Sequence, residues 1–175
     1  VLGDYYSPGI ETKIAVRDYS LPYKWSQEIL ESAQNLTSKI SEDNSRVDLR
    51  LKHFITIDGS DARDFDDAVY CESFENEQFK LWVAIADVAE YVSQASSTDR
   101  EALKRGNSVY FPNHVIPMLP ERLSNDLCSL NPNEEKLVVV CEMTINIDGI
   151  IENFNFYEAT TVSYTHLTLP TNACV

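Results

Sequence analysis

The chain has 175 residues, of which 28 are Asp or Glu and 14 are Lys or Arg, so its formal net charge is −14. Hydrophobic residues make up 43% of the chain, which is enough for a sizeable core and excludes a wholly disordered acidic tail. No apolar run reaches the roughly 18 residues of a membrane span, and the acidic balance argues against binding a polyanion through bulk charge.

The first half of the chain predicts a strand, a helix and a second strand. Residues 13–17 alternate charged and apolar side chains over a short stretch, which indicates a strand. Residues 27–40 carry apolar side chains at helical spacing, with Ser26 as the N-cap. Residues 54–57 are rich in β-branched side chains and predict a strand that ends at an Asp-Gly pair.

A hairpin and a short helix are expected next. Residues 68–74 and 79–86 are two apolar, strand-like segments joined by a short polar connection, which predicts a hairpin. Thr98 and Glu101 have the spacing of a capping box, so a helix is predicted over residues 99–105, where a glycine stops it.

The last predicted elements are a helical turn and a second hairpin. Pro120 can occupy the first position of a helical turn that runs through Leu127. Residues 136–147 and 150–159 form the hairpin around an Asp-Gly turn, the strongest turn signal in the chain. Strands dominate and helices are few, so the predicted class is α+β with a mixed or antiparallel sheet.

The cysteines and the two ends of the chain also carry information. The four cysteines are widely spaced without a C-x-x-C pair, which argues against a zinc site or a dense disulfide framework and favours a reducing cytoplasm. The chain begins with Val1 and has no signal-peptide pattern, so we expect the interior of a longer protein that is not secreted.

The C-terminal segment, residues 162–175, resembles the conceptual translation of a common transposon-based sequencing adapter. One reading frame of that adapter encodes Val-Ser-Tyr-Thr-His-Leu-Thr-Leu-Pro-Thr, which is the sequence of residues 162–171. The alternative is a natural, threonine-rich β-tail. We exclude the segment from reasoning about the fold, as a non-native tail, and expect no function for His166 or Cys174.

An acidic loop follows the strand at residues 54–57. Five aspartates fall within ten positions, and they are Asp58, Asp61, Asp64, Asp66 and Asp67. A fully extended loop would hold the first and last of them roughly 30 Å apart, but Gly59 allows a sharp turn that brings them together. Carboxylates that lie this close either take up protons or bind cations, and an oxygen-only donor set favours Mg²⁺ or Mn²⁺.

Two other interpretations of this loop are available. A merely solvated loop is disfavoured, because flanking apolar strands and Phe65 indicate partial burial, where unpaired charge is costly. A calcium loop of the EF-hand type starting at Asp58 would need a glycine where Arg63 stands and a glutamate where Val69 stands. Arg63 is expected to pair with a neighbouring aspartate.

The loop sequence also resembles a known family signature. Residues 58–69, Asp-Gly-Ser-Asp-Ala-Arg-Asp-Phe-Asp-Asp-Ala-Val, are similar to the signature of the ribonuclease II family of hydrolytic 3′ to 5′ exoribonucleases, and more similar to its ribonuclease R branch. Residues 81–88 and 116–130 are also typical of this family. The resemblance runs from Val1 to about Thr161.

The resemblance implies a domain organisation. Residues 1–20 would be the end of a second cold-shock (OB-like) domain, residues 21–50 a helical connector, and residues 51–161 the N-terminal part of the RNB catalytic domain. The chain ends before the family's later catalytic arginine and S1 domain, so we expect this piece by itself to be inactive.

The resemblance also implies roles for single residues. Asp58, Asp64 and Asp67 would hold Mg²⁺ or Mn²⁺, and Asp66, the fourth carboxylate of this metal cluster, would be the one on which hydrolysis most depends. Tyr110 aligns with a tyrosine that stacks near the 3′-terminal nucleotide, although an aromatic residue beside a proline is more often part of the core.

The expected partner is therefore the 3′ end of single-stranded RNA, without a membrane or a predictable protein partner. Metal-assisted hydrolysis would release nucleoside 5′-monophosphates. The alternative is a non-catalytic, RNA-binding or divalent-cation-binding remnant of the same fold.

Overall fold

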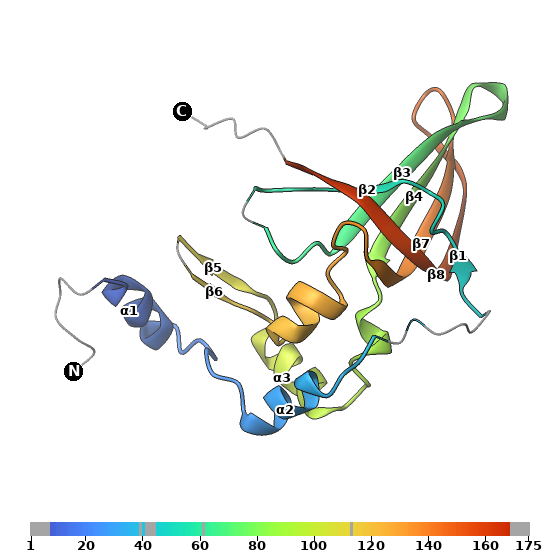
Figure 1. The fold of residues 1–175 in the computed structure, drawn as a ribbon. Coiled ribbons are helices and arrows are strands. Elements are labelled where there is room, and N and C mark those ends of the chain that lie inside the picture. Colours follow the sequence, from blue (N-terminus) through green and yellow to red (C-terminus); the bar gives the residue numbers. More distant parts are fainter. Residues whose placement is uncertain (1–7, 39, 41–44, 61, 113, 169–175) are drawn as a thin grey trace, which may run out of the picture. The chain divides into compact units, whose positions relative to one another are not determined.

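The computed structural model describes residues 8–38, 40, 45–60, 62–112 and 114–168 (Figure 1). The chain divides into two compact units. Unit 1 comprises Val1–Leu36 and Val92–Glu121, and unit 2 comprises Thr37–Tyr91 and Arg122–Val175. Within the described residues, no helix has the length and apolar character needed to cross a membrane.

Unit 1 contains three helices and a small hairpin. Its elements are α1 (Ile10–Asp18), α2 (Gln27–Gln34), α3 (Ser97–Arg105), β5 (Val109–Phe111) and β6 (His114–Ile116), with β5 and β6 antiparallel. Helix α2 contacts α3.

The side chain of Arg105 ties several segments of unit 1 together. Its guanidinium lies 3.4 Å from the ring centroid of Trp25 and donates hydrogen bonds to the carbonyls of Lys24 and Pro117. It also pairs with Glu101 at 3.1 Å, one helical turn earlier in α3. Residues distant in sequence are thereby joined through one planar cation.

Unit 2 is built on a six-stranded sheet in the order β1-β8-β2-β3-β4-β7. The strands are β1 (Val47–Asp48), β2 (Phe54–Asp58), β3 (Asp67–Phe74), β4 (Gln78–Ala86), β7 (Glu135–Ile145) and β8 (Ile151–Thr168). Figure 1 shows β8 as a long strand that begins beside β7 and ends beside β2. The sheet therefore closes on itself, with short 3₁₀ turns at Glu75–Glu77 and Val88–Glu90.

The core of unit 2 lies inside this closed sheet. Its least exposed apolar side chains come from β2, β4, β7 and β8, and they are Phe54, Ala84, Val138, Val140 and Ala159. Trp82 on β4 is also buried, as expected, and its indole N–H donates to the hydroxyl of Tyr157 at 3.1 Å. The α+β class and the mixed sheet are confirmed.

The prediction of a strand at residues 13–17 is wrong, because this segment lies within helix α1. A five-residue alternation is too short to separate strand from helix, and Ile10 and Ile14 also stand four residues apart on one helical face. Glu11 in the first turn and Arg17 in the last turn suit the helix dipole. The assignment of residues 1–20 to a cold-shock domain stays a prediction, and residues 1–7 lie outside the described residues.

The two other predicted helices exist with different bounds. Helix α2 starts after Ser26, whose Oγ accepts the N–H of Ile29 at 3.3 Å, but it ends at Gln34 instead of residue 40. An Asn-Leu-Thr-Ser sequence follows it, and three of these four residues have low helix propensity.

Helix α3 begins two residues earlier than predicted. Its N-cap is Ser96, whose Oγ accepts the N–H of Asp99 at 3.1 Å, so Thr98 is not the cap. Asp99 reaches back to the N–H of Ala95 at 2.7 Å and so takes the reciprocal role expected of Glu101. The predicted stop at Gly106 is confirmed by its φ of 77°.

The predicted elements of unit 2 are largely confirmed. Strands β3 and β4 pair along their whole length as an antiparallel hairpin, and β7 and β8 form the second one. Gly149 in the second turn has a φ of 79°, the left-handed conformation that glycine adopts readily. The helical turn after Pro120 is also present, as a π-helical turn over Arg122–Leu127.

Strand β8 continues into the segment that resembles an adapter translation. Ser163 pairs with Phe54, and Thr168 pairs with Asp58, in parallel with β2. Threonine and valine favour strands whatever their origin, so this geometry is compatible with a non-native tail as well as with a natural one. Residues 169–175 lie outside the described residues.

Candidate active site

The aspartate loop connects two adjacent antiparallel strands of unit 2. Asp58 is the last residue of β2 and Asp67 is the first residue of β3, and the strands pair at Ile55 and Val69. Because β2 and β3 run in opposite directions, the end of β2 and the start of β3 lie at the same edge of the sheet. The fold therefore places Asp58 and Asp67, at the two ends of the predicted aspartate loop, at the same edge of the sheet, while Asp61 lies outside the described residues.

These carboxylates influence one another electrostatically. Burial raises the pKa of Asp58, and the negative charge of Asp67 adds to this effect. Asp66 is more exposed to solvent, but the surrounding protein and then the charges of Asp64, Asp67 and Asp58 raise its pKa as well. All four predicted site aspartates thus belong to one region of repulsive negative charge.

The donor chemistry of this region fits a hard divalent cation. Oδ2 of Asp58 is buried and has no hydrogen-bond partner, which leaves a carboxylate oxygen available for an ion. Among the described residues, however, no three His, Cys, Asp or Glu side chains converge closely enough to form a metal site.

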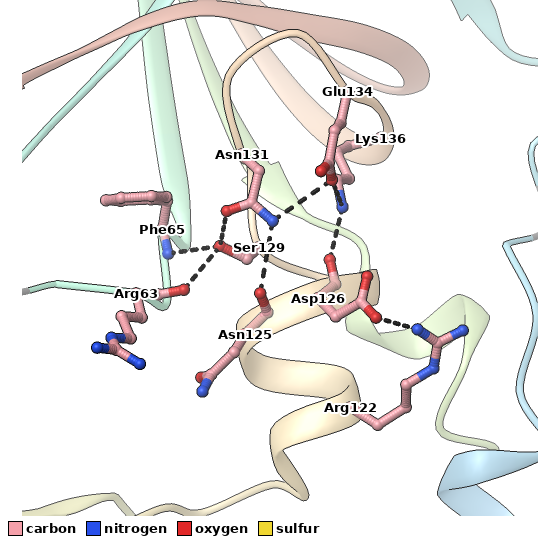
Figure 2. A network of polar contacts seen from close by, with 9 residues as sticks. All are labelled: Arg63, Phe65, Arg122, Asn125, Asp126, Ser129, Asn131, Glu134 and Lys136. Carbon is pink, nitrogen blue, oxygen red and sulfur yellow. Dashed lines mark hydrogen bonds and ion pairs between the residues drawn. The ribbon is translucent and has the colours of Figure 1, made fainter.

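The backbone of the loop is anchored by the segment after the π-helical turn (Figure 2). The hydroxyl of Ser129 accepts the N–H of Phe65 at 3.1 Å, and it lies 3.1 Å from the carbonyl oxygen of Arg63. The N–H of Leu130 donates to the carbonyl of Phe65 at 2.9 Å. Asp64 is thus flanked by anchored peptide groups on both sides.

The next peptide group is held by strand β4. The N–H of Ala86 donates to the carbonyl of Asp66 at 2.9 Å, which extends the β3–β4 ladder by one residue into the loop. Phe65 is buried, as expected for a loop that packs against the sheet. The predicted partial burial of this loop is confirmed.

The expected ion pair of Arg63 with an aspartate does not occur among the described residues. In Figure 2 the Arg63 guanidinium points away from the network around Ser129. Arg122 and Asp126 instead pair with each other within the π-helical turn, and the carbonyl of Asn125 accepts a hydrogen bond from Asn131 at 3.4 Å. These polar residues therefore stabilise the turn.

Tyr110 belongs to unit 1, where it lies on β5. Its side chain is 65% exposed, so its ring is not part of the core, whereas the neighbouring Phe111 is half-buried. A separate cavity of about 1190 Å³ in unit 1 is lined by residues that include Lys13, Arg17 and His114. This cavity contains none of the predicted site residues.

His166, for which the sequence predicts no function, also lies near the aspartates. Its Nδ1 lies 3.9 Å from Oδ2 of Asp58 and 3.1 Å from Oγ1 of Thr56, and its ring packs against Phe65. It lies in residues 162–175, and the assignment of that segment to a non-native tail without function stays a prediction.

Comparison with known proteins defines the class first. Residues 46–171 match the RNB domain family, and the chain belongs to this family. Over 170 residues it is 51% identical to ribonuclease R of Vibrio cholerae, a match that covers 96% of this chain and 21% of that protein. The chain thus spans about a fifth of the length of its relative, and the resemblance to the ribonuclease R branch is confirmed.

Two solved structures are similar as well. Mycoplasma genitalium RNase R in complex with ribose methylated single-stranded RNA superimposes with a TM-score of 0.90 at 38% identity, covering 96% of this chain and 26% of that one. The yeast protein Ssd1, described as a pseudonuclease, has a TM-score of 0.72 at 20% identity, covering 95% of this chain and 22% of that one. The second likeness shows a shared fold alone.

Proposed function

We propose that this chain is the N-terminal part of the catalytic domain of a hydrolytic 3′ to 5′ exoribonuclease of the ribonuclease R type. Its substrate is the 3′ end of single-stranded RNA, its products are nucleoside 5′-monophosphates, and it acts in the cytoplasm. The observation that carries this proposal is the set of four mutually interacting aspartates at the β2–β3 loop of an RNB domain.

The aspartates of the loop have different roles in this proposal. Asp58, Asp64 and Asp67 would hold Mg²⁺ or Mn²⁺, and the bound ion would supply the positive charge that activates water and stabilises a leaving 3′ oxygen. Asp66, whose backbone is fixed by Ala86, contributes the carboxylate on which the hydrolytic step most depends.

The exposed ring of Tyr110 stacks on a base near the 3′ end. Base stacking on an aromatic face contributes about 1–3 kcal/mol and does not depend on sequence. An exonuclease that must accept every nucleotide in turn needs such a contact.

A second candidate is a non-catalytic binding module with the same fold. The lack of convergence among the described carboxylates supports it. The presence of all four aspartates of the family signature favours the enzyme.

Substitution of Asp66 tests the enzyme. In the full-length protein from the uninterrupted gene, Asp66→Asn is expected to lower the rate of hydrolysis by at least about 100-fold, because one metal-site carboxylate is lost. Gel analysis of 5′-labelled RNA measures the rate, and fluorescence anisotropy should show nearly unchanged RNA affinity. Asp148→Asn, at the exposed β7–β8 turn, is the matched control and should have no effect. Normal turnover by Asp66→Asn would remove this residue from the catalytic role.

Removal of metal separates the enzyme from the binding module. We expect EDTA to stop hydrolysis by the full-length protein and added Mg²⁺ or Mn²⁺ to restore it, with nucleoside 5′-monophosphates as products on chromatography. Hydrolysis that continues in EDTA would contradict the metal site. RNA binding without hydrolysis at any metal concentration would establish the binding module instead.

A further inference from the structure

We propose that Ser129 is a positioning residue for the catalytic aspartates, because it fixes the loop backbone on both sides of Asp64. The inference rests on the proposed function and adds to it a residue that touches neither metal nor RNA. Ser129 follows Asp64 by 65 positions, and it reaches the aspartate loop only through the tertiary structure.

The Ser129 hydroxyl forms hydrogen bonds on both sides of Asp64. A hydroxyl carries one hydrogen and two acceptor lone pairs. It accepts the N–H of Phe65 at 3.1 Å and shares its own hydrogen between the carbonyl of Arg63, at 3.1 Å, and Oδ1 of Asn131, at 3.2 Å (Figure 2). One side chain thus holds the groups immediately before and after Asp64.

The loop backbone around Asp64 is held by hydrogen bonds from two other segments of unit 2. Between β2 and β3 the sheet ladder is interrupted, and Asp64 lies outside both strands. The N–H of Leu130 donates to the carbonyl of Phe65, and the N–H of Ala86 donates to the carbonyl of Asp66. Four consecutive peptide groups before β3 are therefore held from outside the loop, and Ser129 supplies side-chain contacts to the first two of them, on either side of Asp64.

Ser129 itself is held in a buried, hydrogen-bonded segment of unit 2. It is 0% exposed, and it follows the π-helical turn, where the N–H of Cys128 donates to the carbonyl of Leu123 at 2.9 Å. Nearby, the Lys136 ammonium donates to the carbonyl of Asp126 at 2.5 Å and pairs with Glu134 at 2.7 Å. Because Ser129 is buried and the segment around it is hydrogen-bonded internally, its hydroxyl can hold the loop backbone in a fixed position.

Loss of the Ser129 hydroxyl is expected to move the backbone around Asp64. Without the hydroxyl, the N–H of Phe65 and the carbonyl of Arg63 lose a partner in a buried place, and the peptide groups around Asp64 must shift to find another. Loss of a group that orients metal ligands typically costs about 10–100-fold in metal affinity or activity. RNA affinity should change little, because Ser129 is buried.

A pair of variants with the same shape isolates the hydroxyl. In the full-length enzyme, Ser129→Thr retains the hydroxyl and Ser129→Val replaces it with a methyl group. We expect Ser129→Val to have a kcat about 10–100-fold below that of Ser129→Thr and a similarly weaker Mn²⁺ affinity, with KM for RNA within about twofold. Electron paramagnetic resonance measures Mn²⁺ binding without reference to activity. Amide exchange at Phe65 should be faster in the Val variant.

Ser96→Ala is the matched control, because it also removes a 3.1 Å bond from a serine Oγ to a backbone N–H, at the start of α3. It should lower the melting temperature but leave kcat and Mn²⁺ affinity unchanged. If neither Ser129 variant folds, Asn131→Ala removes the side chain that contacts the hydroxyl and should still weaken Mn²⁺ binding. Unchanged Mn²⁺ affinity in folded Asn131→Ala would then count against the inference.

Two results would overturn the inference in distinguishable ways. The first result is that the Thr and Val variants have the same kcat, Mn²⁺ affinity and Phe65 amide exchange rate while the wild type hydrolyses RNA and binds Mn²⁺. This result would remove the positioning role and leave the proposed function intact. A wild type that neither binds Mn²⁺ nor hydrolyses RNA would overturn the proposed function, and this inference with it.

Discussion

Three cysteines lie among the described residues, and their surroundings give them different chemistry. Cys71 on β3 is exposed, Cys141 on β7 is half-buried, and Cys128 is buried beside the π-helical turn. Burial, with a further contribution from the charge of Asp66, raises the pKa of Cys128 to about 12. The reactive form of a cysteine is the thiolate, so Cys128 is held in its inert form.

Alkylation tests this difference. At pH 8 only about one Cys128 in ten thousand is a thiolate, if its pKa is about 12. Iodoacetamide should therefore modify Cys71 in the folded protein and spare Cys128, as measured by peptide mass spectrometry. In urea both should react, which serves as the control. Equal labelling of the two in the folded state would contradict the burial of Cys128.

At the scale of elements, Arg46, which lies just before β1, pairs with carboxylates at the turn after β4 and on β8. Its guanidinium lies 2.7 Å from Asp87 and 3.0 Å from Glu90, at the turn after β4, and 3.5 Å from Glu158 on β8. The side chains of Arg46 and Asp87 are only 11% and 7% exposed. A charge pair that is this buried is costly to break, because the remaining carboxylate has no water to replace its partner.

Replacement of Arg46 should therefore destabilise unit 2. Arg46→Met is expected to lower the free energy of unfolding by about 3 kcal/mol, since it leaves Asp87 buried without its cation. Urea unfolding followed by circular dichroism measures the loss. Arg50→Met is the control, because Arg50 pairs with Asp48 and Glu135 at the exposed surface and its loss should be much smaller. Similar losses for the two variants would contradict a buried role for Arg46.

At the scale of the whole molecule, the residues predicted for catalysis and for RNA binding come from different units of the chain. The aspartates belong to unit 2 and Tyr110 belongs to unit 1. The net charge of −14 lies entirely outside residues 162–175, which contain no charged side chain of Asp, Glu, Lys or Arg. An RNA enzyme needs positive surface, so under the proposed function this surface belongs to other parts of the full-length protein.

Substitution of Tyr110 tests whether unit 1 contributes to substrate binding. In the full-length enzyme, Tyr110→Ala should raise KM for single-stranded RNA roughly tenfold, because it removes one base-stacking contact of about 1–3 kcal/mol. Steady-state kinetics measures this change, and Tyr110→Phe should behave like the wild type because it keeps the ring. An unchanged KM in Tyr110→Ala would remove Tyr110 from the RNA-binding site.

Much of the fold and the identity of the loop residues follow from local sequence. The Asp-Gly pair at Asp148 predicts the β7–β8 turn because glycine accepts a positive φ. Ser26 predicts the start of α2 because its side chain can satisfy a free N–H. The aspartate spacing of the β2–β3 loop indicates a cation site because crowded carboxylates need positive charge. Each of these signals depends on neighbours within a few residues.

The tertiary structure decided what such signals leave open. Residues 13–17 form part of a helix, although their short alternation suits either structure. Strand β8 closes the sheet by pairing with both β7 and β2, and Ser129 anchors the peptide groups around Asp64. These contacts join residues far apart in the chain, which leave no periodicity or motif in the sequence. The residues of the aspartate loop were therefore predictable from the sequence, but the contacts that hold the loop backbone in place were not.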